Sequence, residues 1–205
     1  MPIIEIITAI KDLSLAVAGV VTAVVAIRGL RNWNRELKGK AAFEVARGLA
    51  KATYRLRDEI RMCRSPLLTA REFPEGYGEL SRNKTPENEA QAYAHIFTNR
   101  WNSVFASLQE FDTQTLEAEA LWDNSIREKT DALRKLVRKL NVAIEAFIAN
   151  ERSGGKDFSS DKEFGRDIRS TVFASPTDAD NKLSASIESS ISFIQDELRP
   201  HLRRA

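Results

Sequence analysis

Apolar residues recur at helical spacing along most of the chain, and near the N-terminus they merge into one unbroken run. From Leu13 to Ile27 fifteen residues carry no charge and are apolar on every side of a helix. Such a helix would be about 22 Å long, against roughly 30 Å for the hydrocarbon core of a bilayer. The flanking Lys11 and Arg28 side chains can reach outward and extend the usable length. The pattern therefore predicts a short membrane-spanning helix.

Two other interpretations of this run stay open. A cleaved signal peptide has its basic residues before the apolar region, whereas here they follow it. A helix buried in the core of a soluble fold is permitted by so short a run, although such a helix usually keeps a polar side. We favour a single-pass anchor at residues 1–30, followed by a cytoplasmic helical bundle at residues 31–205.

Positive charge gathers directly after the apolar run, while the charges before it nearly cancel. The positive-inside rule then places the following domain in the cytoplasm and the N-terminus outside the cell membrane. Lipid headgroups would contact this flank, and an aromatic ring with a polar edge suits the same layer. The residues that we assign to the membrane interface are Arg28, Arg31, Trp33, Arg35, Lys38 and Lys40.

Two amphipathic helices are predicted in the first half of the remaining chain. Apolar residues step by three and four from Ala42 to Cys63, and Pro66 is expected to end that helix. Residues 65–85 read as a long loop, after which Thr85 and Pro86 give a helix start. The next seam steps 4-3-4-3-4-3 and is read as core, as is an aromatic stripe along it. The seam is Ala90, Ala94, Phe97, Trp101, Val104, Leu108 and Phe111, and the stripe is Phe97, Trp101, Phe105 and Phe111.

A break near Asp112-Thr113 is expected to lead into another long helix, which would carry Trp122 to Phe147 and end at Gly154-Gly155. Residues 151–176 look polar and irregular, and a last helix is expected from about Asp178 to Pro200. No stretch alternates with period two over a strand's length. The sequence therefore predicts an all-α protein in which an N-terminal transmembrane helix precedes an antiparallel bundle of about four long helices.

Candidate chemistry is sparse. His95 and His201 stand in no zinc-ligand or di-iron spacing, and no phosphate loop or nucleophile motif occurs. Cys63 continues an apolar helix face and is read as a buried small hydrophobe. We therefore expect neither an enzyme nor a bound cofactor or metal. The net charge of +2 and a basic face at residues 134–139 without interleaved aromatics also argue against a nucleic-acid partner.

A denser polar group lies near the end of the helix that stops before Pro66. Its arginines and aspartate stand at spacings that allow ion pairs on one helix side. One interpretation is a salt-bridged helix end, and the other is a contact site for a protein partner. The residues assigned to this partner contact are Tyr54, Arg57, Asp58, Arg61 and Arg64.

Two segments carry a resemblance. The stretch Trp33 to Lys40, with the pattern W-x-R-E-L-x-G-K, and the stretch Tyr54 to Pro66, with Y-x-L-R-D-x-I, resemble a group of uncharacterised bacterial single-pass membrane proteins with a cytoplasmic helical region. The tail from Ile191 to Leu202 is also similar to theirs. That group has no assigned activity, so the resemblance implies bacterial origin and topology without a function.

The function expected from these features is a membrane-anchored interaction or scaffold protein that binds a protein partner or itself. The alternative is a soluble or oligomeric helical effector, whose apolar first helix packs in a core or inserts into a membrane on activation. An enzyme with an atypical site would need a pocket that gathers Tyr54, Arg57, Asp58 and His95.

Overall fold

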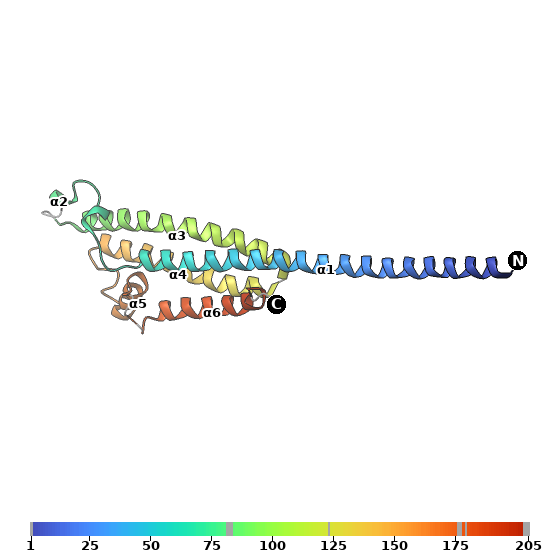
Figure 1. Ribbon diagram of the computed structural model, residues 1–205. Coiled ribbons are helices and arrows are strands. Elements are labelled where there is room, and N and C mark those ends of the chain that lie inside the picture. The colour runs from blue at the N-terminus through green and yellow to red at the C-terminus, as the bar shows by residue number, and fades with distance from the viewer. Residues whose placement is uncertain (1, 81–83, 123, 176–177, 179, 203–205) are drawn as a thin grey trace. The chain divides into compact units, whose positions relative to one another are not determined.

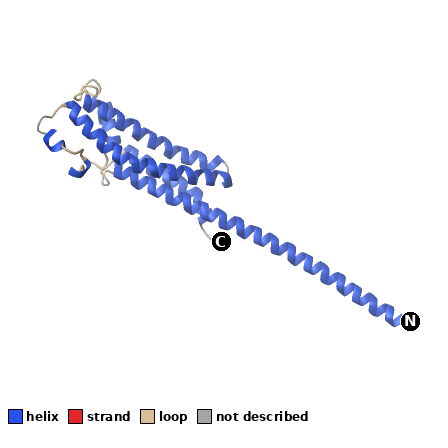
Figure 2. Cartoon of the chain, turned by 90° about the horizontal axis from the view of Figure 1, so that it is seen from above, coloured by secondary structure: helices blue, strands red, loops and turns tan. Residues whose placement is uncertain are grey.

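The computed structural model describes residues 2–80, 84–122, 124–175, 178 and 180–202. The chain divides into two compact units, residues 1–44 and 45–205, and helix α1 (Pro2–Cys63) contributes to both. In the described part every regular element is a helix and none of the residues is in a strand (Figure 2). The predicted all-α class with a long apolar N-terminal helix is confirmed. The predicted boundary between anchor and bundle, after residue 30, lies within α1, which is continuous to Cys63.

Four long helical segments form the second unit: the last part of α1, α3 (Pro86–Trp122), α4 (Asn124–Arg152) and α6 (Lys182–Leu202). A shorter helix, α5 (Lys162–Val172), lies between α4 and α6 in the sequence. The segment that joins α1 to α3 contains a 3-10 turn, η1 (Ala70–Glu72), and one short helix, α2 (Tyr77–Leu80). Figure 1 shows the long segments of this unit lying side by side.

Ion pairs between these segments establish that they run antiparallel. Arg55 of α1 binds Glu110 of α3 at 2.6 Å, whereas Arg100, earlier on α3, donates to the carbonyl of Cys63 at the end of α1. Arg61 of α1 binds Glu188 of α6 at 2.7 Å, while Tyr54, two turns earlier on α1, accepts a hydrogen bond from Gln195, two turns later on α6. Arg134 of α4 binds Asp112 of α3, and Arg152, later on α4, pairs with Glu87, earlier on α3. Ser125 and Lys129, at the start of α4, both bind Glu197 near the end of α6. The bundle is therefore up-down-up-down, as predicted.

The core of this unit is built from the apolar face of each long helix, because a helix that exposes such a face in water must cover it. Leu49, Leu56 and Ile60 of α1 are fully buried, as are Phe97 and Phe111 of α3. Aromatic edges fill the end of the bundle near Phe97, where the rings of Phe147 and Phe173 also meet. The α3 seam is thus core at Ala90, Phe97, Val104 and Phe111, but Phe105 is 51% exposed and the stripe prediction is wrong there.

The predicted break at Asp112-Thr113 is wrong, since α3 continues through both residues to Trp122. Thr113 donates its hydroxyl hydrogen to the carbonyl of Gln109 at 2.9 Å, so its side chain bonds within the helix instead of ending it. Asp112 accepts a hydrogen bond from Arg134 of α4 at 2.6 Å. Trp122, which we assigned to the following helix, ends α3 and stacks on His201 with ring centroids 4.2 Å apart.

Three other boundaries differ from the sequence expectation. The segment expected to be irregular contains α5, which begins because Asp161 accepts hydrogen bonds from the backbone N–H groups of Glu163 and Phe164. The last helix begins at Lys182 instead of near Asp178 and includes Pro200 in its final turn. The predicted long loop contains η1 and α2. The positions of such short helices depend on side-chain contacts, which the period of the apolar residues does not predict.

Candidate functional site

The apolar segment of α1 is the most unusual surface in the described chain. From Leu13 to Ile27 every side chain is exposed, including Leu13 at 67% and Val20 at 64%. The helix contains an 18-residue window with a mean hydropathy of 2.1, and 0% of that window is buried. By length and composition this helix can cross a membrane. Within its own unit nothing covers the apolar side chains.

The predicted membrane-interface residues lie on the same continuous helix and are all exposed. Arg28, Arg31, Arg35 and Lys38 follow one another in steps of three, four and three, so they share one side of α1. Trp33 and Lys40, seven residues apart, share another side. Lys40 pairs with Glu36 at 2.9 Å, and this hydrogen bond lowers the pKa of the Glu36 carboxyl below its usual range. The helix therefore carries cations around more than one side directly after its apolar segment.

Four of the five predicted partner-contact residues lie together on the bundle surface. Arg57 stands over the ring of Tyr54 at 5.0 Å and binds Asp58 at 2.8 Å, while Arg61 binds Glu188 of α6. Arg57, Asp58 and Arg61, but not Tyr54, line a cavity of about 600 Å³ between the end of α1 and the start of α6. Its apolar wall includes Ile60, Met62 and Ile187. Ion pairs at a protein surface are each worth at most about 1 kcal/mol, so the arginines at this rim can break them and pair with the carboxylates of a bound protein.

Arg64, the fifth predicted partner-contact residue, has a different role. Its side chain is buried, with only 3% of the residue exposed. The guanidinium group donates to the carbonyls of Thr171 and Ser170 and to side-chain oxygens of Ser184 and Asn181, at 2.8 to 3.1 Å. Burial lowers the pKa of this guanidinium below its usual value. Arg64 therefore holds α1, α5 and α6 together, and although it also lines the cavity beside Arg57, its side chain is buried and fully engaged in these hydrogen bonds.

The groups considered for chemistry stay apart. His95 is exposed and bonds Asn99, and it does not line the cavity beside Arg57. Cys63 is 1% exposed, as predicted, and burial raises the pKa of its thiol to about 11. Among the described residues no group of three or more His, Cys, Asp or Glu side chains could hold a metal ion. His95 and Cys63 therefore form no common site among the residues that the structure describes.

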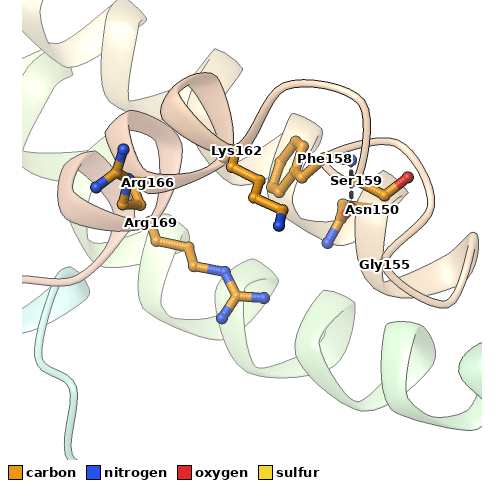
Figure 3. A pocket seen from close by; sticks show the side chains of 8 residues that line it. Asn150, Gly155, Phe158, Ser159, Lys162, Arg166 and Arg169 are labelled. Carbon is orange, nitrogen blue, oxygen red and sulfur yellow. Dashed lines mark hydrogen bonds between the residues drawn. The ribbon is translucent and has the colours of Figure 1, made fainter.

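Sequence reasoning missed a second pocket, which lies between the end of α4 and α5 (Figure 3). Its volume is about 300 Å³. Asn150, at the end of α4, forms one wall, and Lys162, Arg166 and Arg169 line it from α5. The signal that was available is the spacing of these three cations at i, i+4 and i+7, which places them on one helix side. It was hidden because α5 itself was not predicted.

Comparisons of the chain with protein-family models, with curated proteins and with solved structures found no match in any of the three. The resemblance to uncharacterised bacterial membrane proteins therefore stays a prediction. What is established is the fold: an all-α chain in which a helical bundle follows a helix apolar and long enough to span a membrane.

Proposed function

We propose that this chain is a single-pass membrane protein whose helical bundle binds a protein partner at the cytoplasmic surface. The observation that carries the proposal is the complete exposure of the apolar side chains from Leu13 to Ile27. Burying apolar surface stabilises it by about 25 cal/mol per Å², so a helix exposed on all sides needs lipid or another chain around it. Lipid is the environment that also suits the basic and aromatic residues after it.

The orientation rests on the exposed cations of α1. The positive-inside rule favours the cytoplasm for Arg28, Arg31, Arg35, Lys38 and Lys40, and Trp33 is suited to the headgroup layer. The bundle follows these residues, so we place it in the cytoplasm and the N-terminus outside. Bacterial origin belongs to the same proposal and rests on the resemblance alone.

Membrane fractionation tests the anchor. We expect the full-length chain to stay in the membrane pellet through alkaline carbonate and to be released only by detergent. A variant with Val17→Arg and Val21→Arg, two exposed positions on one side of α1, should leave the pellet, since each arginine costs about 2.5–3.5 kcal/mol near the bilayer centre on insertion scales. The matched control is Arg47→Gln with Lys51→Gln, also four apart on α1. Recovery of the unchanged chain in the soluble fraction would refute the anchor.

Thiol labelling tests the orientation, because the single native cysteine is buried. In intact spheroplasts a membrane-impermeant maleimide should label Thr8→Cys, before the apolar segment, and should label Asn34→Cys only after permeabilisation. The reverse pattern would place the bundle outside the cell.

The partner-binding part of the proposal rests on the cavity beside Arg57 and Arg61. An apolar wall with half-buried Arg57 and exposed Arg61 at its rim suits a protein segment that inserts an apolar side chain and offers a carboxylate to an arginine. A photo-crosslinking residue at Met62, which is 68% exposed, should give one discrete adduct in membranes, and the Arg57→Ala variant should lose it. The same probe at exposed Lys139 is the control. Equal adducts from both positions, or none from Met62, would contradict partner binding at this cavity.

The oligomeric alternative is favoured by the same exposure, since a second copy could also cover the apolar helix. It predicts a single oligomer in detergent-free buffer. The membrane anchor predicts aggregation or loss under those conditions.

A further inference from the structure

The pocket between α4 and α5 is formed by a sharp turn at the end of α4. Gly154 has a φ of +69°, and the N–H of Gly155 donates to the carbonyl of Asn150 at 2.8 Å. This pairing closes α4 and sends the chain back over its last turn. The close approach of Gly165 to Phe158, where an added Cβ would stand 2.8 Å from the Phe158 Cβ and 3.0 Å from its ring carbon Cγ, lets α5 pack tightly against that turn. The pocket walls are therefore held by backbone geometry.

Cations gather along the α5 side of this pocket. Lys162, Arg166 and Arg169 all line it, and Arg169 has one distant carboxylate partner, Glu151, at 3.8 Å. No ion pair or side-chain hydrogen bond is seen for Lys162 among the residues that the structure describes. In Figure 3 the Lys162 ammonium group points into the same space as Arg169, whereas the Arg166 guanidinium points away from it. The space is therefore positively charged on at least two sides.

The wall opposite contributes a further donor. Asn150 is 0% exposed, and its Oδ1 accepts a hydrogen bond from the backbone N–H of Phe158 at 3.0 Å. That bond fixes the amide so that its Nδ2 points toward the pocket, where it has no hydrogen-bond acceptor (Figure 3). Buried donors in folded proteins nearly always have an acceptor, so an unpaired one indicates a group that the site is built to receive.

The groups that converge on this space are therefore donors: an amide N–H, an ammonium and a guanidinium. A metal cation would be repelled, and a neutral polyol would lack acceptors for its hydroxyl hydrogens. A tetrahedral phosphate offers several oxygens in different directions, and both arginine and lysine bind it well. A volume of about 300 Å³ lies at the small end of ligand sites.

We propose that this pocket binds the phosphate group of a phosphomonoester, with Asn150 Nδ2, Lys162 and Arg169 donating to its oxygens. The ester can belong to a small soluble compound or to a lipid headgroup, and both offer the same terminal phosphate. The inference does not depend on the proposed anchor or on the cavity beside Arg57.

Calorimetric titration of the full chain in phosphatidylcholine nanodiscs with glycerol 3-phosphate tests the proposal. We expect saturable binding that Lys162→Gln weakens by about tenfold or more, because a hydrogen bond from a charged donor is lost. Asn150→Asp keeps the oxygen that accepts from Phe158 but replaces the donor with a carboxylate, so it should abolish binding. Lys139→Gln, an exposed change about three turns earlier on α4 and outside the pocket lining, should leave the affinity within about twofold.

The outcomes separate the sources of the ester and the ways in which the proposal can fail. If nanodiscs that contain phosphatidate compete with glycerol 3-phosphate, a lipid headgroup reaches the site; if they do not, the ligand is soluble. An equal loss with Lys139→Gln and Lys162→Gln would show general surface attraction and overturn the site. Absence of binding to the folded wild-type chain would overturn it as well, leaving an ordinary water as the acceptor for Asn150.

Discussion

Replacing Arg64 should destabilise the bundle far more than replacing its exposed neighbour on the same helix. The Arg64→Met change keeps a long side chain in the site but removes four hydrogen bonds from a charged donor. Bonds of this kind contribute about 1.5–3 kcal/mol each, so the gross loss is roughly 6–12 kcal/mol. Removing the cation also removes the cost of keeping it out of water, which is several kcal/mol.

The net expectation is a loss of about 3 kcal/mol, close to the range seen when a buried charged network is broken. Part of it comes from acceptors left without a donor. In the variant the Ser170 carbonyl still accepts a hydrogen bond from the Asn181 amide at 2.7 Å, and Asn181 Oδ1 still accepts one from the Ser184 N–H at 3.0 Å. The Thr171 carbonyl loses the one donor seen for it among the described residues. For a domain of this size the melting temperature should fall by about 6–12 °C.

Denaturant unfolding of the full chain in detergent, followed by circular dichroism, measures the effect. The matched control is Arg61→Met, which lies one turn earlier on α1 and loses two exposed ion pairs, with Glu188 at 2.7 Å and with Asp58 at 3.9 Å. It should cost no more than about 1 kcal/mol. A midpoint for Arg64→Met that equals the midpoint for Arg61→Met, with unchanged slopes, would refute the claim that Arg64 holds the three helices together.

Three further outcomes follow from the same packing. The Cys63 thiol, with its pKa raised to about 11, should not react with Ellman's reagent at pH 8 until the chain is unfolded. Because the thiol of the unfolded chain ionises near pH 9.0, the free energy of unfolding should fall as the pH rises from 9 to 11. The hydrogen bond from Arg100 lowers the pKa of the Glu72 carboxyl, so the ionised carboxylate stabilises the fold. Wild type should therefore be more stable than Glu72→Gln above about pH 5, and this difference should disappear as the pH falls below the usual carboxyl pKa of 4.5. Acid titration of both proteins measures it. Gly165→Ala should cost about 1–3 kcal/mol because the added methyl meets Phe158, and an unchanged melting temperature would contradict the packing of α5.

Local pattern was sufficient wherever a residue's role depends on its neighbours in sequence. The apolar run from Leu13 to Ile27, the helix face that leads to Cys63 and the stop before Pro66 all follow from spacing and composition. On the buried side of a helix apolar residues recur every three or four positions, so this period predicts both that the segment is a helix and which of its sides is buried. The bundle and the burial of Cys63 could be predicted for this reason.

Only the tertiary structure decided which polar residues are exposed and which are enclosed. Arg64 and Arg61 belong to one polar cluster in the sequence, yet the partners of Arg64 stand more than a hundred positions away and enclose it. The sequence predicted a helix end near Asp112, whereas in the structure Asp112 lies within α3 and accepts a hydrogen bond from Arg134 of α4. The proposed phosphate pocket could not be predicted for the same reason, since Asn150 and Lys162 line it from either side of a turn. A side chain's hydration is fixed by what packs over it, and contacts between distant segments leave no periodic trace in the chain.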